Sequence, residues 1–482
     1  MLNMDNKLLV ERSAKGKQSI TLPLCDVPEC KIENYIPKEF LREKACNLPE
    51  VSEPEVVRHF VNLSTLNHHV DKGFYPLGSC TMKYNPKINE KIATSPGISE
   101  LHPFQDPGTV QSALKIYYEV EQLLCKITGM AAFTLQPAAG SHGELCGVML
   151  MRAYHRAKNN HKTTILIPDS AHGTNPASVH LGGYKAVTVK STDEGLVDIE
   201  DLKAKLNDEV AGFMLTNPNT LGIFEKNVME ISELVHSVDG LMYMDGANMN
   251  ALLGIVKIAD MNFDITHFNL HKTFSTPHGG GGPGSGPIGV GEKLVSYLPV
   301  PRVEKTEEGY ILDWDKEESI GKMMGFWGNY GVIARTWVYI RMLGEEGLKD
   351  VSKYAIINSN YIRASLEDVY DLPFKSPTMH ECVFSGSRQK KQGVKTLDIA
   401  KRMLDYGIHA PTIYFPLIVS EALMVEPTET ESKETLDDFI HIMRTIAKES
   451  EENPQLVRSA PQNTPIKRLD EVKANKDLNV RW

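Results

Sequence analysis

Short apolar runs alternate with amphipathic segments through the middle of the chain. Five runs rich in apolar or β-branched residues have the length of buried strands: residues 163–168, 186–190, 210–216, 241–245 and 264–269. Apolar residues recur at helical spacing in three further segments: residues 109–128, 198–207 and 227–238. Strands that alternate with helices in this way predict a mainly parallel sheet with helices on both faces.

The remaining segments predict the domain organisation. Residues 1–60 are rich in Pro, Glu and Lys and have little periodicity, which is typical of an arm that lies on a neighbour. A long helix near residues 331–341 leaves the large domain, and a smaller α+β domain follows. The predicted parts are an arm (1–60), a large domain (61–335), a small domain (336–453) with helices at 396–407 and 432–449, and an irregular polar tail (454–482).

Composition and charge exclude several classes of protein. Apolar residues make up 41% of the chain and charged residues 24%, as in ordinary globular proteins. The net charge of -10 argues against a nucleic-acid partner. No apolar run reaches the ~18 residues of a membrane helix, and the first residues lack the apolar core of a signal peptide. The seven cysteines form neither a disulfide framework nor a zinc site, so we expect a reduced, cytoplasmic protein without a metal.

Polar side chains follow the predicted strands at the ends where a parallel sheet binds its ligands. The candidates are His172, Thr216, Asn217, Asn219, Asp245, Ala247 and Lys272. Earlier in the chain, the small residues Ala139, Gly140 and Ser141 begin a predicted helix, whose free N–H groups favour a phosphate.

These side chains are the types that a pyridoxal phosphate (PLP) enzyme needs. A lysine binds the aldehyde, a carboxylate keeps the pyridine nitrogen protonated, and a helix N-terminus binds the phosphate. Each residue alone has an ordinary explanation, such as a solvated loop lysine or a helix N-cap aspartate. Their combination at successive strand ends favours a PLP site. A P-loop nucleotide site stays an alternative, although the glycine run at 279–282 lacks the Gly-Lys-Ser/Thr ending.

Longer strings carry a specific resemblance. HKTFSTPHGGGGPGSGP, DSAHGTNPAS, TNPNTLGIFE and MDGANMNA, with GFYPLGSCTMKYNP near the start and EALMVEPTETES near the end, are similar to glycine dehydrogenase (decarboxylating), the P-protein of the glycine cleavage system. More narrowly, the chain resembles subunit 2, the catalytic chain of the two-subunit form. The resemblance covers nearly the whole chain. It implies the aspartate aminotransferase-like fold type I of PLP enzymes, with a seven-stranded sheet in the large domain and a small C-terminal α+β domain.

The resemblance also implies roles for individual residues. Lys272 would bind PLP covalently, Asp245 would pair with the pyridine nitrogen, and His172 and Ala247 would lie on the two ring faces. The other implied cofactor contacts are Thr216 and Asn217 at the ring hydroxyl, and Ala139, Gly140 and Ser141, with His271 or Thr273, at the phosphate. Ser79, Thr81 and Lys83 are candidate ligands of the glycine carboxylate. The glycines at 279–282 would let the backbone approach the cofactor or the substrate arm.

The implied reaction is PLP-dependent decarboxylation of glycine, with release of CO2 and transfer of the aminomethyl group to the lipoyl arm of H-protein. Residues 76–86 are the candidate lining of a channel for that arm, and Cys80 within them is more simply an unreactive thiol than a redox-active one. The implied partners are lipoylated H-protein and a homologous subunit 1, in an α2β2 heterotetramer. Two alternatives stay open: another fold type I PLP decarboxylase or lyase, and a non-catalytic subunit. The presence of Lys272, Asp245 and His172 argues against the second.

Overall fold

The computed structural model describes residues 7–44, 46–279, 281–282 and 284–479, in two compact units, Met1–His69 and Val70–Trp482. The first unit contains four short or isolated elements: α1 (Leu9–Arg12), η1 (Ile32–Asn34), η2 (Lys38–Phe40) and α2 (Glu53–Leu66). Ser52 is the N-cap of helix α2, and its backbone N–H donates to the Glu55 carboxylate, as in a capping box. The segment predicted as an arm with little periodicity therefore includes part of a regular helix.

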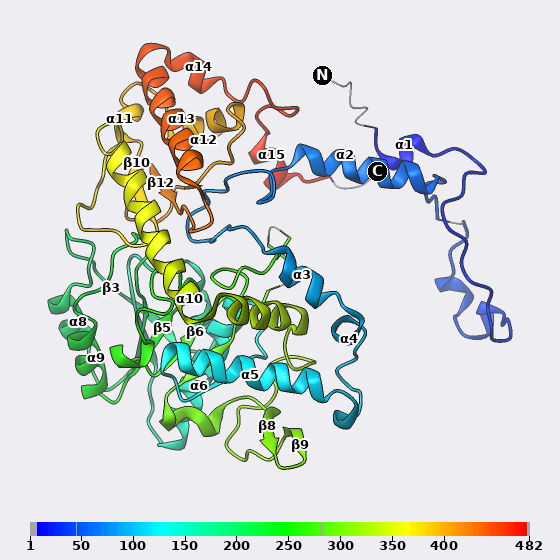
Figure 1. Ribbon diagram of the computed structural model, residues 1–482, viewed down its shortest axis with the longest axis horizontal. Coiled ribbons are helices and arrows are strands. Elements are labelled where there is room, and N and C mark those ends of the chain that lie inside the picture. The colour runs from blue at the N-terminus through cyan, green and yellow to red at the C-terminus, as the bar shows by residue number, and fades with distance from the viewer. Residues whose placement is uncertain (1–6, 45, 280, 283, 480–482) are drawn as a thin grey trace. The chain divides into compact units, whose positions relative to one another are not determined.

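A seven-stranded sheet forms the centre of the second unit (Figure 1). The strand order is β1-β7-β6-β5-β4-β2-β3, and β7 is antiparallel to both of its neighbours while the other pairs are parallel. The strands are β1 (Ala132–Thr134), β2 (Thr164–Pro168), β3 (Lys185–Val189), β4 (Val210–Thr216), β5 (Leu241–Asp245), β6 (Ile265–His267) and β7 (Ile288–Val290). The prediction of a mainly parallel sheet is confirmed, and β4 and β5 have the predicted bounds.

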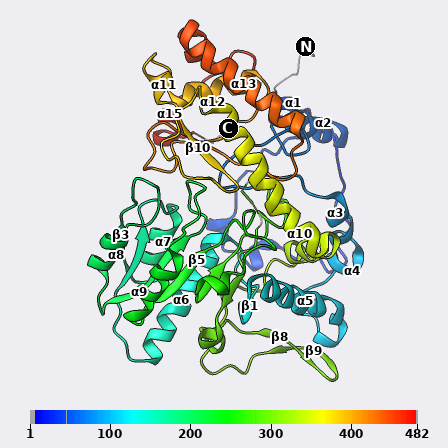
Figure 2. The ribbon, with the colours of Figure 1, turned by 60° about the vertical axis from the view of Figure 1, so that its left-hand side comes forward.

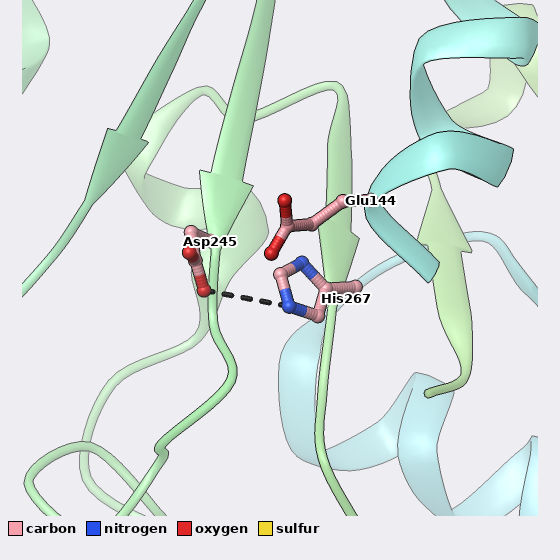
Figure 3. Close-up of side chains that lie close together, drawn as sticks. All are labelled: Glu144, Asp245 and His267. Atoms are coloured by element: carbon pink, nitrogen blue, oxygen red, sulfur yellow. Dashed lines mark ion pairs between the residues drawn. The ribbon is translucent and has the colours of Figure 1, made fainter. Parts of the chain in front are cut away.

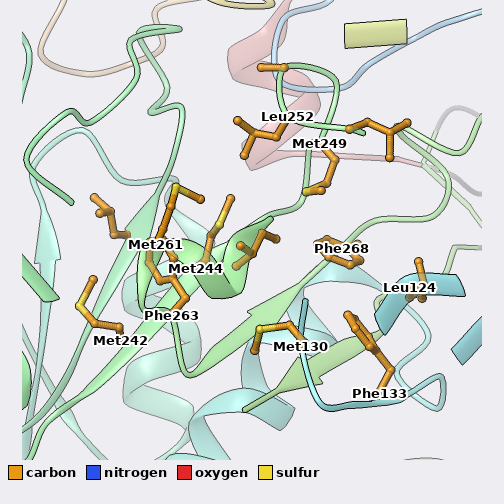
Figure 4. Packing of buried hydrophobic residues seen from close by; sticks show 14 of the residues in the cluster. Leu124, Met130, Phe133, Met242, Met244, Met249, Leu252, Met261, Phe263 and Phe268 are labelled. Carbon is orange, nitrogen blue, oxygen red and sulfur yellow. The ribbon is translucent and has the colours of Figure 1, made fainter. Parts of the chain in front are cut away.

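Successive residues of β5 face opposite sides of the sheet. Leu241 and Tyr243 pack with residues of α6 and α7, whereas Met242 and Met244 pack with residues of α5, α8 and α9. Figure 4 shows Met242 and Met244 within this second cluster of buried apolar side chains. The helices are α5 (Gln111–Thr128), α6 (Gly140–Ala157), α7 (Thr174–Leu181), α8 (Ile199–Lys205) and α9 (Val228–Ser237). Burial on both faces explains why the strands are almost continuously apolar.

The long helix α10 (Tyr330–Leu366) connects the large sheet to a smaller one (Figures 1 and 2). It is interrupted at Gly344, where φ is 64° and ψ is -171°, a conformation that favours glycine. The smaller sheet is antiparallel in the order β10-β12-β11 and packs with α12 and α13 around a separate apolar core. Its elements are β10 (Cys382–Ser385), α11 (Ser387–Lys390), α12 (Thr396–Asp405), β11 (Thr412–Ile413), β12 (Ala422–Val425) and α13 (Lys433–Glu452). The separate core agrees with a small domain, whose boundaries at 336 and 453 stay predictions.

The connecting segments and the C-terminus add short elements. They are α3 (Lys87–Ala93), α4 (Pro96–Ser99), η3 (Pro107–Thr109), η4 (Ile258–Met261), η5 (Glu292–Tyr297), the hairpin β8 (Arg302–Thr306) and β9 (Gly309–Asp313), α14 (Pro454–Arg458) and α15 (Glu471–Lys476). The tail was expected to be irregular, but α14 forms because Val457 packs into the core of the smaller sheet. None of the helices in the described ranges combines the length and apolarity that crossing a bilayer requires.

Candidate active site

Strand ends and loops border a cavity of about 200 Å³. The carboxyl ends of β4 and β5, the turn after β6, the first residues of α6 and the residues just before β10 all contribute to it. The predicted site residues that line the cavity are Ser79, Ala139, Gly140, Ser141, His172, Thr216, Asn219, Asp245, Ala247 and Lys272. The cavity therefore lies where ligands bind to sheets of this type.

Lys272 supplies an unengaged amine to this cavity. It lies in a turn after β6, in which its backbone N–H donates to the carbonyl of Asn269 at 2.9 Å and its carbonyl accepts from Ser275 at 3.0 Å. Among the described residues, its Nζ has neither a hydrogen-bond nor an ion-pair partner. The turn fixes the backbone while the amine stays available for reaction with an aldehyde.

Asp245 ends β5 as a buried carboxylate, with 5% of its surface exposed. Its Oδ2 accepts from Asn175 at 2.9 Å and its Oδ1 from the backbone N–H of Ala247 at 3.1 Å. Burial alone raises the pKa of this carboxyl, but the charge of His267 and the hydrogen bonds from Asn175 and Ala247 outweigh it and hold the pKa below its ordinary value. Asp245 is thus arranged to stay ionised and to face a cationic ring nitrogen.

Two residues close to Asp245 were not predicted from the sequence: His267 and Glu144 (Figure 3). His267 is the register partner of Asp245 in β6, with its Nε2 3.4 Å from Asp245 Oδ1 and its Nδ1 hydrogen-bonded to Tyr243 at 2.9 Å. The ligand-type atoms of Glu144, Asp245 and His267 lie within 4.8 Å of one another, a spacing that a metal site would also have. Both carboxylates already accept hydrogen bonds from protein groups, Asp245 from Asn175 and Ala247 and Glu144 from the hydroxyls of two residues of α7.

Glu144 also connects α6 to the loop that carries His172. Its two carboxylate oxygens accept from the hydroxyls of Thr174, at 2.7 Å, and Ser178, at 2.8 Å. The backbone N–H of Thr174 in turn donates to Nδ1 of His172 at 3.2 Å. The His172 ring lines the cavity, and Phe415 packs against it edge-on, with ring centroids 5.5 Å apart. These contacts fix the ring at the cavity wall.

The N-terminus of α6 points its first N–H groups at the cavity. Its N-cap, Ala139, has no side chain that can accept a hydrogen bond, so these donors stay available for an anion. A Cβ at Gly140 would lie 2.4 Å from Oδ1 of Asn269, and a Cβ at Gly286 would lie 2.1 Å from the carbonyl oxygen of Ala139. Glycine at 286 therefore lets two backbone segments approach closely, and glycine at 140 leaves room for the side chain of Asn269.

The glycine run at 279–282 is predicted to let the backbone approach the cofactor or the substrate arm, and this stays a prediction. Within the protein, a Cβ at Gly279 or Gly281 would meet no atom within 4 Å, and both residues have positive φ, whereas a Cβ at Gly282 would lie 2.8 Å from the carbonyl oxygen of His278. Gly280, within the same run, lies outside the described residues. The close contact with the backbone of Ala139 is made by Gly286, outside this run.

The residues present fit PLP. The cavity combines an unengaged amine, a buried ionised carboxylate and an uncapped helix N-terminus. In addition, the hydroxyl of Thr216 and the amide oxygen of Asn269 are buried at the lining with no hydrogen-bond partner among the described residues. Buried polar atoms are rarely left unpaired, so both indicate a polar ligand.

Two predicted cofactor contacts do not reach the cavity. Asn217 is buried, and its amide oxygen accepts from the backbone N–H of Glu225 at 2.9 Å, so its side chain is used for folding the loop after β4. His271 accepts from the backbone N–H of Ser285 at 3.3 Å. Burial, followed by the charges of His278 and Lys272, lowers the His271 pKa to about 4. A neutral, engaged imidazole is poorly suited to a phosphate. Thr273, the alternative, accepts from Met249 N–H at 2.8 Å.

Two of the three candidate ligands of the glycine carboxylate are also engaged elsewhere. The ammonium of Lys83 is buried, 2.6 Å from Glu429 and 3.0 Å from the hydroxyl of Tyr339. Thr81 donates from both its backbone and its hydroxyl to Glu426. Only Ser79 of this set lines the cavity. The nearby Cys80 fits an unreactive thiol, since burial raises its pKa and disfavours the thiolate.

His380 and Glu381, just before β10, were not predicted from the sequence but line the cavity beside Lys272. Burial and then the charge of Lys272 lower the His380 pKa to about 3. Burial and then the charge of Glu426 raise the Glu381 pKa to about 8. No pattern around these residues signals a site, because the tertiary fold alone brings them to the ends of β4–β6.

Comparisons with known proteins agree with this geometry. Residues 21–308 match the family model of the glycine cleavage system P-protein, and residues 351–468 match that of the glycine dehydrogenase C-terminal domain. A probable glycine dehydrogenase (decarboxylating) subunit 2 of Chloroherpeton thalassium is 57% identical, over 99% of this chain and 98% of the relative. The protein of the same name in Caldanaerobacter subterraneus subsp. tengcongensis is 56% identical over 100% of both chains.

Solved structures show the same fold. A glycine decarboxylase (P-protein) in inhibitor-bound form aligns with a TM-score of 0.73 and 19% identity, covering 86% of this chain and 94% of that one. A cysteine desulfurase of Thermococcus onnurineus aligns with a TM-score of 0.61 and 15% identity, covering 78% and 95%. Fold type I of PLP-dependent enzymes, predicted from the resemblance, is thus confirmed. With the full-length relatives and the matched family model, these findings show that the chain belongs to the glycine cleavage system P-protein family.

Proposed function

We propose that this chain decarboxylates glycine with PLP bound to Lys272, as the catalytic chain of a two-subunit P-protein. The observation that carries the proposal is the unengaged amine of Lys272 in one cavity with the buried, ionised carboxylate of Asp245. Membership in the P-protein family selects glycine over the substrates of other fold type I decarboxylases and lyases. The aminomethyl group passes to the lipoyl arm of H-protein.

The residues that line the cavity have different roles toward PLP. When bound, PLP supplies an aldehyde that reacts with amines and a protonated ring that takes up the electrons left by CO2. Asp245 keeps the ring nitrogen protonated, and the network through His267 and Asn175 keeps Asp245 ionised. His172 and Ala247 bound the ring, Thr216 binds a ring substituent, and the N-terminus of α6 binds the phosphate.

Borohydride labelling tests the anchor. The purified chain with PLP is expected to absorb in the visible range, and borohydride should remove this absorbance and leave a pyridoxyl group on the peptide that contains Lys272. The reason is that Nζ of Lys272 is the amine that lines the cavity among its described residues. A label found on any other lysine would contradict the assignment.

The name of the relatives, subunit 2, implies a partner subunit 1. For this chain we further propose an α2β2 assembly that receives lipoylated H-protein. Support comes from the first unit, where several large apolar side chains are exposed: Ile20, Leu22, Leu24, Tyr35, Phe40 and Leu48. A segment with so much exposed apolar surface gains stability by binding a neighbour.

Co-expression tests this assembly. The chain alone is expected to be poorly soluble or weakly active, and co-expression with a homologous subunit 1 should yield a heterotetramer with glycine-dependent CO2 release in the presence of lipoylated H-protein. Light scattering with chromatography gives the mass of the assembly. Deletion of residues 1–52 should weaken assembly while the chain still binds PLP. A monodisperse, fully active chain without a partner would be inconsistent with the proposal.

A further inference from the structure

Two buried carboxylates hold the loop that carries Ser79 and Thr81. Both residues have positive φ, 63° and 51°, and their backbone N–H groups donate to Glu381 and Glu426 respectively, each at 2.9 Å. A Cβ at Gly78 would lie 2.2 Å from the side chain of Met424, so the loop is packed directly against β12. Left-handed backbone at non-glycine residues is costly and is concentrated at functional sites.

The two carboxylates are stabilised unequally. Glu426 accepts from Thr81 N–H at 2.9 Å, from the Thr81 hydroxyl at 2.7 Å and from Asn248 at 2.6 Å. Glu381 accepts the Ser79 hydrogen bond and, within the described ranges, no other. Their exposed fractions are 1% and 3%. Burial raises the pKa of both carboxyls, but at Glu426 the hydrogen bonds from Thr81 and Asn248 oppose this rise. We therefore assign the shared proton to Glu381, which has fewer donors.

Among the described residues, Lys272 is the cation whose charge acts on Glu381. Glu426 faces it from the end of β12 and raises its pKa, while Lys272, from the turn after β6, lowers it. His380 is adjacent, with Nε2 3.9 Å from Oε1 of Glu381, and is neutral because its pKa is about 3. Cys80, from the loop, is kept as a thiol by burial. The titration of Glu381 is therefore coupled to the charge of Lys272 and of Glu426.

We propose that Glu381 is the acid that donates a proton to Nζ of Lys272 when glycine displaces this amine, and that it takes the proton back when the lysine rebinds. The proposal rests on the proposed function, since it assigns the proton transfer at the same lysine. In the step, the O–H bond of Glu381 breaks and an N–H bond forms on Nζ. A neutral acid and amine become a carboxylate and an ammonium, and no other reactant is needed.

The geometry suits such a transfer. Both groups line one cavity, yet no ion pair joins them, so the proton crosses through a water or after a rotation of the lysine side chain. After the transfer, the attraction between the Glu381 carboxylate and the Lys272 ammonium keeps the lysine away from the reacting carbon until it rebinds. The charge of Glu426 raises the Glu381 pKa and so favours the protonated form of Glu381 between turnovers.

Infrared difference spectroscopy of the PLP-free chain tests the protonated state. A carboxylic-acid carbonyl band is expected at pH 7 that disappears as the pH rises through about 8 and is absent in Glu381→Gln. In Lys272→Ala the midpoint should move up by about one pH unit or more, because the nearby cation is lost. The matched control is Glu421→Gln, a buried carboxylate that pairs with Lys390 outside the cavity, which should leave this band unchanged.

The pH dependence of the free energy of unfolding gives a second test of the Glu381 protonation state on the same samples. The Glu381 pKa is about 8 in the folded chain, above the ordinary value of 4.5. Its contribution to stability is therefore complete below pH 4.5 and is lost as the pH rises through 8. Urea unfolding should show that wild type loses stability relative to Glu381→Gln over this window.

Stopped-flow spectroscopy of the PLP-loaded chain tests the transfer itself. Glu381→Gln should slow the displacement of Lys272 by glycine about 100-fold with unchanged PLP affinity. Glu381→Asp should recover part of the rate, and Glu421→Gln should equal wild type. A band that persists in Glu381→Gln, a midpoint unmoved in Lys272→Ala, or displacement at the wild-type rate would each overturn the proposal. The infrared measurement needs no cofactor, so its outcome is separate from that of the proposed function.

Discussion

Replacement of Lys272 by alanine is expected to abolish covalent PLP binding and the exchange of the glycine carboxyl with CO2. The amine is positioned by its turn and lacks a competing partner, and the described cavity offers no second lysine that could replace it. We expect exchange to fall at least about 1,000-fold, equivalent to about 4 kcal/mol of barrier. Visible absorbance and isotope exchange with labelled bicarbonate measure the two effects.

Lys272→Arg is the matched variant, because it keeps a cation in the cavity but cannot form the covalent bond. It should be as inactive as Lys272→Ala while preserving more of the fold's stability. Lys226→Ala, which changes a lysine that is 65% exposed and paired with Glu194, should behave as wild type. Exchange near the wild-type rate in Lys272→Arg would show that the lysine acts by its charge alone.

Asp245→Asn is expected to fold and bind PLP but to lose most decarboxylation. The anchor and the phosphate site remain, whereas an amide cannot hold the ring nitrogen proton by charge. A loss of about 100-fold corresponds to about 2.7 kcal/mol in the barrier. A PLP titration by absorbance measures binding, and CO2 exchange measures the chemistry.

Asp264→Asn is the control for this variant. Asp264 is also a buried aspartate and lies directly before β6. Its carboxylate does not line the cavity but contacts His236, Lys293 and the backbone N–H of Met242. Its loss should lower stability and leave exchange per folded molecule unchanged. Equal losses in the two variants would mean that Asp245 acts only in folding.

Part of the candidate site could be predicted from the ends of individual strands. Lys272, Asp245, His172 and Thr216 each follow or end a strand, and all four line the cavity. Their position depends on the alternation of strands and helices, which is a local property of the chain. The same reasoning misplaced Asn217, because adjacent residues of a strand end face opposite sides and the sequence does not say which side faces the ligand.

Other parts of the site depend on contacts between distant segments. His267 reads as one more residue of an apolar strand, and only the register of β5 with β6 places it against Asp245. The sequence alone made Lys83 a reasonable ligand for the glycine carboxylate. In the fold, however, its ammonium forms an ion pair with Glu429, which follows β12. A buried ammonium requires an ionic or hydrogen-bonding partner, and local sequence patterns do not predict a partner that lies so far along the chain.

The sequence by itself determined the mainly parallel sheet, the strand ends that carry the lysine and the aspartate, and the family. These follow from periodicity and from long local strings, which act within one element at a time. The tertiary structure alone decided which glycines make the close approach, which polar residues are used for folding, and that Glu381 meets Ser79, 302 residues away. The reason is physical: protonation and packing are set by the groups that burial brings together, and burial is a property of the whole fold.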